Sequence, residues 1–308
     1  MYRTFVILRH TFVEAVLQPI YSLLLAVGAA VLVIFALLPF FTLGEDTNMF
    51  KSVGLDIILL LTLIATLFAT SKSIYEEIED RTMLTLMSKP ISRLEVMVGK
   101  YLGIITAAAM MVAVLGALIV LCTYWRLPVD NQMRTRTLDD REILQIWNMR
   151  KMHIAGLIPS LLLLWMQISV LAAIGVAIST RLSLVVNLPV VILLYIAGNL
   201  TRFLFPVQFG TDDANTPLEG RSVLVKGAAY VFGLILPYLA AFDIRSYAVY
   251  RVIGLAGTEY AANASAVSPA AMWADVGVTT LYAICYITFA LSIGMLSFRT
   301  RELGGGEG

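Results

Sequence analysis

The sequence predicts an all-α polytopic membrane protein with six transmembrane helices. Of its 308 residues, 59% are hydrophobic and only 14% are charged, whereas soluble domains average about 45–50% apolar and about 25% charged residues. The apolar residues gather in runs of about 20, the length that an α-helix needs to cross the hydrocarbon of a bilayer. Residues 1–308 are therefore expected to form a single membrane domain.

Polar segments separate the expected spans, which are residues 20–41, 53–71, 97–122, 154–179, 184–205 and 271–298. The segment 123–153 is too charged to be embedded, so we expect an external loop that contains a helix from Leu138 to Met152. The run 227–242 is apolar but short, which predicts a re-entrant segment before the last span. A full crossing there would instead add a seventh span, and this alternative stays open.

An amphipathic helix is expected before the first span. Phe5, Leu8, Phe12 and Val16 form an apolar stripe at helical spacing, and charged residues occupy the opposite face. Such a helix can lie in the membrane interface. A plain amphipathic lead-in to the first span explains the pattern equally well.

The stretch Glu76–Gly103 mixes many charges with helix start and stop signals. Acidic residues open a first short helix, where the helix dipole favours negative charge. Pro90 ends this helix, because proline cannot continue the hydrogen-bond pattern. Ser92 and Glu95 then have the spacing of a capping box, which starts the next helix. A helix, a break and a capped restart predict a compact elbow at the membrane surface.

This elbow resembles the cytoplasmic segment between the second and third spans of permeases of type-2 ABC exporters. The residues that match the family pattern, in its order, are Glu77, Glu79, Arg81, Thr82, Leu84, Pro90, Ser92, Arg93, Gly99 and Lys100. Many relatives have glycine where Arg81 stands, and elsewhere the resemblance is one of layout. It implies that the elbow contains the coupling helix, which docks on a separate ATP-hydrolysing subunit. A charged loop that merely connects two spans is the other interpretation.

The resemblance also implies a permease in the cytoplasmic membrane that works as a homo- or heterodimer with two ATPase subunits. This chain would bind no cofactor, and ATP and Mg²⁺ would act on the ATPase partner. Membrane lipid would be its other contact. The numbers of Lys and Arg on the two sides do not decide the orientation, but the resemblance places the elbow in the cytoplasm.

Several kinds of chemistry find no support in the residues, and no catalytic residue is predicted. There is no G-x-x-x-x-G-K-[ST] phosphate loop. His10 and His153 are far apart in sequence and have no neighbouring ligands for a metal. A formal net charge of +1 argues against a nucleic-acid partner.

Gln167 lies near the middle of the fourth span, the deepest position of a strongly polar side chain. A buried amide needs hydrogen-bond partners, so Gln167 either joins helices or lines a transport pathway. Asp56, Arg202 and Asp275 lie near span ends, whereas an ion-driven carrier usually has ionisable residues deep inside its spans. A secondary carrier and a non-transporting membrane scaffold are the alternatives to an ABC permease. The substrate is not readable, since apolar spans suit a lipid, a drug or a peptide.

Small residues recur at intervals of four at the start of the third span. Gly99, Gly103 and Ala107 lie on one face of the expected helix. Small side chains allow two helices to approach closely in a membrane, so we expect this face to pack against another helix.

Overall fold

The computed structural model describes residues 2–37, 46–79, 92–132, 140–204, 236–245, 249 and 267–299. Among these residues, five helices are long and apolar enough to cross a membrane: Pro19–Leu37, Thr47–Glu79, Arg93–Arg126, Arg150–Ser179 and Pro269–Phe298. A shorter apolar helix, Leu184–Asn199, lies where the fifth span is expected. The predicted all-α polytopic membrane protein is confirmed.

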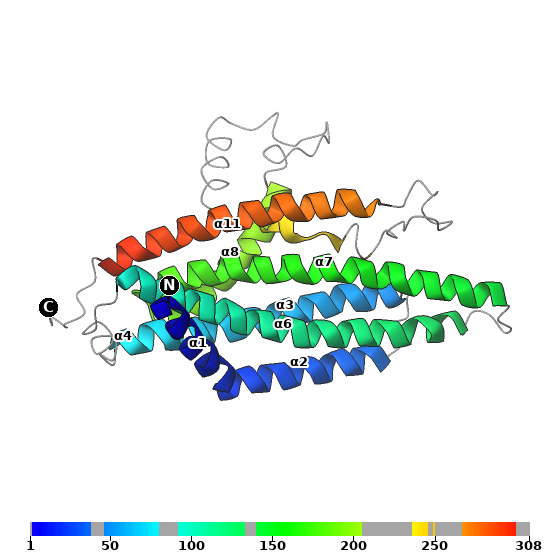
Figure 1. Ribbon diagram of the computed structural model, residues 1–308, viewed down its shortest axis with the longest axis horizontal. Helices are drawn as coiled ribbons and strands as arrows, with labels where there is room; N and C mark the ends of the chain where they lie inside the picture. Colours follow the sequence, from blue (N-terminus) through cyan, green and yellow to red (C-terminus); the bar gives the residue numbers. More distant parts are fainter. Residues whose placement is uncertain are drawn as a thin grey trace, which may run out of the picture.

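Three long helices form the centre of the bundle, and two others flank it (Figure 1). The helices are α1 (Tyr2–Leu17), α2 (Pro19–Leu37), α3 (Asp46–Thr70), α6 (Arg93–Gln132), α7 (Asp140–Ser179), α8 (Leu184–Leu204) and α11 (Pro269–Arg299). In the spans built on α3 and α7, 61% of the most apolar window is buried, against 17% for α2 and 22% for α11. Helices α3 and α7 are therefore internal, while α2 and α11 present wide apolar faces outward.

Helix α3 continues without a break into two further elements. A π-helical turn, η1 (Ser71–Glu76), and the short α4 (Glu77–Glu79) follow it directly. The expectation that acidic residues open a new helix at Glu76 is wrong for this reason: the chain is already helical when it reaches Glu77. The wider π turn is a feature that recurs at functional sites.

Helices α6 and α7 are longer than the spans expected for them. Each has 40 residues, about 60 Å in length, which is about twice the thickness of the hydrocarbon core. Instead of a loop over 123–153, α6 extends to Gln132 and α7 begins at Asp140. The expected helix 138–152 is thus the first part of α7. Charge in this region excludes the membrane, but it does not prevent a helix from continuing into water.

Helix α1 packs closely against α6, as the row of small residues predicts. A methyl group at Gly103 would lie 2.7 Å from the carbonyl oxygen of Leu8, and one at Gly99 would lie 2.9 Å from Ile7. The buried residues of α1 are Ile7, Thr11 and Ala15. The predicted stripe is therefore shifted, and Phe5 is 61% exposed, because the glycines admit the small face of α1 rather than its aromatic one.

Aromatic side chains join α2, α6 and α7 by hydrogen bonds to backbone carbonyls. The Tyr21 hydroxyl donates to Ala107 O at 3.0 Å, and Tyr101 donates to Ser169 O at 3.1 Å. The Trp165 indole N–H donates to Ile105 O at 3.0 Å. In a membrane these polar groups have no water to bond, so contacts between helices must satisfy them.

The expected re-entrant segment 227–242 lies only partly within the described residues. Residues 227–235 are outside them, and a short 3-10 helix, η3 (Leu239–Phe242), ends the run. Leu239 and Phe242 are buried in a cluster with residues of α3, α7, α8 and α11. Whether the segment re-enters the membrane stays a prediction.

The contact between α1 and α6 predicts opposite effects for the same substitution at two glycines. Gly103→Ala should lower the melting temperature of the purified protein, since the added methyl group meets the α1 backbone at 2.7 Å and overpacking costs about 1–3 kcal/mol. Gly277→Ala is the matched control, because a methyl group there meets nothing within 4 Å. The control should be neutral or stabilising by up to about 1 kcal/mol, the helix preference of alanine over glycine. A Gly103→Ala protein at least as stable as the control would contradict this packing.

Candidate functional site

Predicted elbow residues meet at one end of the bundle, which we call the elbow end. It comprises η1, α4, the start of α6, the turn between α7 and α8, and the end of α11. In Figure 1, α4, the start of α6 and the end of α11 lie at the same end of the molecule as α1. Of the predicted residues, Glu77, Glu79, Ser92, Arg93, Gly99 and Lys100 are described, whereas Arg81, Thr82, Leu84 and Pro90 lie outside the described residues.

A buried ion pair joins α4 to α6. Lys100 Nζ lies 2.5 Å from Glu77 Oε1, and the side chains are 4% and 25% exposed. The same ammonium group donates hydrogen bonds to the carbonyl oxygen and, at 3.3 Å, to the hydroxyl of Ser73 in the π turn. A buried ammonium is costly unless it is paired and hydrogen-bonded. Lys100 meets both conditions only while η1 and α4 stay in place against α6.

The predicted capping box at the start of α6 is confirmed. The Ser92 backbone N–H donates to Glu95 Oε2 at 2.9 Å, and the Glu95 N–H donates to Ser92 Oγ at 3.2 Å. These reciprocal bonds satisfy backbone donors that a helix N-terminus leaves without partners. The elbow therefore ends in a well-defined helix start.

Two arginines attach the neighbouring helix ends to α11. Arg93 Nη1 donates to Phe298 O at 3.1 Å, and its guanidinium lies 5.6 Å from the centre of the Phe298 ring. Arg181, in the turn after α7, donates from Nε to Ser297 Oγ at 2.8 Å. Thr180 also lies 3.3 Å from that hydroxyl. The ends of α6, α7 and α11 are thus joined by polar contacts.

The described residues of the elbow end leave little space between them. Ile74, Val96, Met97, Lys100, Thr180 and Phe298 line a cavity of about 10 Å³. This is about the volume that one water molecule needs. The arrangement suits transmission of movement between helices, and among the described residues there is no group of three or more His, Cys, Asp or Glu that could hold a metal.

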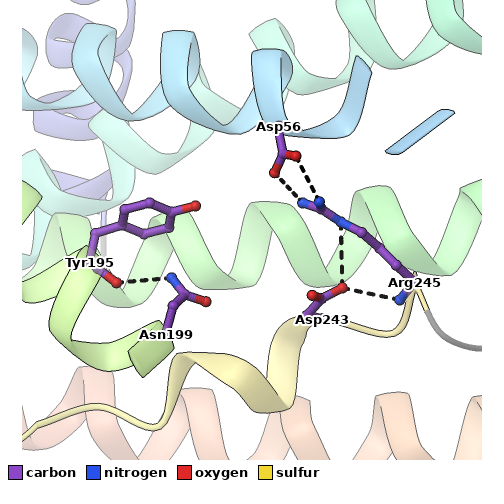
Figure 2. A network of polar contacts seen from close by, with 5 residues as sticks. All are labelled: Asp56, Tyr195, Asn199, Asp243 and Arg245. Carbon is purple, nitrogen blue, oxygen red and sulfur yellow. Dashed lines mark hydrogen bonds and ion pairs between the residues drawn. The ribbon is translucent and has the colours of Figure 1, made fainter. Parts of the chain in front are cut away.

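A second polar cluster joins α3 to the segment that follows η3 (Figure 2). Arg245 makes a bidentate ion pair with Asp56 of α3, at 2.9 Å from Nη1 to Oδ2 and 2.5 Å from Nη2 to Oδ1. Asp243 Oδ1 accepts from the Arg245 backbone N–H at 3.1 Å and lies 3.4 Å from its Nε. Burial alone would lower the pKa of Arg245, but the hydrogen bond and charge of Asp56 raise it, so the guanidinium stays charged.

Gln167 lies beside this cluster, where it lines a cavity of about 30 Å³ together with Ser160, Tyr195, Asn199, Asp243 and Arg245. Gln167 is only 5% exposed. A cavity of this size holds about two water molecules, which could satisfy the buried amide. Gln167 thus faces a polar cavity between α3, α7 and α8 rather than a purely apolar contact between two helices.

Sequence reasoning missed Arg245, Asp243 and the Lys100–Glu77 pairing. Asp56 and Arg245 are 189 positions apart, and only the fold brings them together. The usable signal was the presence of Lys100 in an otherwise apolar helix, because a charge in such a place needs a partner.

The buried ion pair predicts an order of stability among single substitutions. Glu77→Gln should lower the melting temperature of the purified protein more than Lys100→Met does, because it leaves the more deeply buried charge without its anion. Losing one partner of a fully buried pair costs about 3–5 kcal/mol, and the partial exposure of Glu77 places the loss at or below the lower end of that range. Glu79→Gln, at an exposed position on the same helix, is the control and should melt like the wild type. Equal melting temperatures for all three would show that the pair does not hold α4 to α6.

Comparison with known proteins agrees with this architecture. No curated protein sequence matches the chain significantly. The sequence profile of the family described as "ABC-2 family transporter protein" matches residues 15–303, nearly the whole chain. Members of this family are multi-pass permeases, usually of the cytoplasmic membrane, and the five apolar helices described above fit that role. The chain belongs to the ABC-2 transporter family, as a type-2 ABC permease subunit.

Proposed function

We propose that this permease moves a substrate out of the cell, driven by ATP that a separate ATPase subunit hydrolyses with Mg²⁺. The observation that carries the proposal is the buried Lys100–Glu77 pair. Glu77 lies on the side of the elbow that continues α3, and Lys100 lies on the other side, in α6, so the pair joins the two sides. In this proposal the elbow end faces the cytoplasm and docks on the ATPase.

Force applied at the elbow would reach several spans together. Helices α3, η1 and α4 are continuous, and Lys100 ties them to α6. Arg93 and Arg181 then extend the connection to α11 and to the turn between α7 and α8. Interactions with two discrete arrangements can carry coupling between distant sites. The polar contacts at the elbow end are suited to move as one unit when the ATPases close.

A second permease copy and membrane lipid are the other partners in this proposal. The apolar windows of α2 and α11 are mostly exposed. Lipid can cover such faces, and a second subunit can cover part of them. The role proposed for the elbow is the same whether the partner copy is identical to this chain or a related chain.

An ion-driven carrier fits the structure less well. The buried charged side chains that the structure describes are Lys51, Lys100 and Arg126, and each stands toward an end of its membrane-spanning helix. The middle of the bundle offers neutral polar groups such as Gln167 and Thr66. A transporter without a deep ionisable group needs another source of energy, which an ATPase partner supplies.

The proposal predicts that an ATPase subunit co-purifies with this chain from its native membrane in mild detergent. The reconstituted complex should hydrolyse ATP, and a screen of lipids, drugs and peptides should find compounds that stimulate hydrolysis. The permease purified alone serves as the control and should show no hydrolysis. Recovery of this polypeptide without any ATPase under several gentle conditions would count against the proposal.

Glu79 offers a test of coupling that leaves the buried pair intact, since its side chain is exposed beside Glu77. Glu79→Lys should preserve expression and the amount of ATPase bound, but should reduce stimulated hydrolysis per assembled complex by about fivefold or more, the lower range of typical coupling effects. Asp275→Lys makes the same charge change at an exposed position toward the other end of the bundle, and it should have little effect. Equal hydrolysis by the two variants would remove Glu79 from the coupling site.

A further inference from the structure

A segment near the end opposite the elbow closes the polar cavity beside Gln167. We call this segment the strap and define it as residues 237–245 together with Val249. Phe242, Asp243, Ile244 and Arg245 of the strap line the cavity. The remaining walls come from α3, α7 and α8, with Gln167 and Ser160 on α7 and Tyr195 and Asn199 on α8. Figure 2 shows Asp243 and Arg245 on this segment, next to Asp56, Tyr195 and Asn199.

The strap is attached to α3 by polar contacts. Arg245 binds both carboxylate oxygens of Asp56. Lys51 Nζ donates to Val249 O at 3.3 Å and lies 2.7 Å from His153 Nδ1 of α7. The Asp56 side chain is 54% exposed and that of Arg245 is 23% exposed, so water can compete for the ion pair. Water reaches the Asp56 carboxylate and weakens the pair, while its bidentate geometry makes it stronger than an ordinary surface pair.

The attachment of the strap to α8 and α11 is of another kind. The Tyr238 backbone N–H donates a hydrogen bond to the Tyr282 hydroxyl at 2.8 Å. The Phe242 and Tyr282 rings lie 6.2 Å apart. Leu239 is fully buried and packs where a methyl group on Gly198 of α8 would lie 2.8 Å from it. This side of the strap is packed and mostly apolar. On the α3 side, Lys51 is buried, whereas the ion pair between Asp56 and Arg245 is partly exposed to water.

The buried amide of Gln167 shows that the space under the strap is a polar site. Its side chain is 5% exposed and lines the cavity together with polar side chains of α7, α8 and the strap. A buried amide needs hydrogen-bond partners, and water or a polar group of a ligand in this cavity can supply them.

We propose that the strap is a gate, that the Asp56–Arg245 ion pair is its latch, and that it opens by leaving α3 while staying packed on α8 and α11. Opening exposes Gln167 to the side of the membrane opposite the elbow. The statement that this side is the cell exterior rests on the proposed function. The proposal that the ion pair is a latch does not depend on it.

The test measures how fast a cysteine in the cavity reacts. Gln167→Cys is introduced into a protein in which Cys122 and Cys285 are replaced by alanine, and the purified protein is treated with a small charged methanethiosulfonate. Asp56→Asn and Arg245→Gln should each raise the reaction rate by about three- to tenfold, the shift expected when a partly exposed ion pair is lost. The exchanged pair, Asp56→Arg with Arg245→Asp, should return the rate toward that of the unmodified latch. Unchanged rates in both single variants would overturn the gate.

Two controls separate a gate from general loosening of the fold. Asp275→Asn removes an exposed acid that is not part of the latch, and it should leave the rate unchanged. Val191→Cys places a thiol at a fully buried position of α8 that does not line the cavity, and Asp56→Asn should not make it reactive. Reaction at that position would mean that the fold has loosened, and it would overturn the proposal.

The same variants in intact cells test the orientation of the protein separately from the latch. An impermeant reagent added outside should label the Gln167→Cys protein faster when the latch is broken. Faster labelling only in inverted membrane vesicles would leave the latch standing and would show that the orientation in the proposed function is wrong.

Discussion

The burial of the Lys100 ammonium group is the constraint on which the elbow end depends. Its side chain is 4% exposed, so its charge must be balanced inside the protein. The balance comes from Glu77 and from both oxygens of Ser73, which brings the π turn and α4 against α6. Helices α3 and α6 cannot separate at this end without leaving a charge buried and unpaired. The capped start of α6 and the contacts of Arg93 to α11 lie next to this junction between α4 and α6 and add to it.

The nature of the signals explains what the sequence could predict. Apolar helices and the capping box depend on residues close together in the chain. Five helices of spanning length and the capping box are present among the described residues, whereas the count of six spans stays a prediction. Helix α1 was also expected, although Ile7 rather than Phe5 lies on its buried side. Periodicity shows that a helix is amphipathic, but the partner decides which small or large residues it buries. Here Gly99 and Gly103 of α6 decide it.

The errors have physical causes as well. Charge in the segment 123–153 predicts that it lies outside the membrane, but it says nothing about helix formation, so the extension of α6 and α7 was missed. Glu77 and Glu79 suggested a helix start because acidic side chains are favourable near a helix N-terminus, where the helix dipole is positive. The uninterrupted passage from α3 through η1 shows no start there. Contacts such as Arg245 with Asp56, 189 positions apart, require the packed fold and no local pattern contains them.

The continuous helix formed by α3, η1 and α4 makes polar contacts at Glu77 and at Asp56, and the two contacts differ in exposure. Glu77 and Asp56 are separated by about 30 Å along the helix. The contact at Lys100 is nearly excluded from water, whereas Asp56 is 54% exposed and its ion pair competes with solvent. In the proposed gate, the contact that yields first when α3 moves is therefore the one to Arg245, while the pair between Glu77 and Lys100 still holds α4 to α6. Under the proposed function, a push at the elbow would then release the strap. The same push applied to two firm attachments would only strain the bundle.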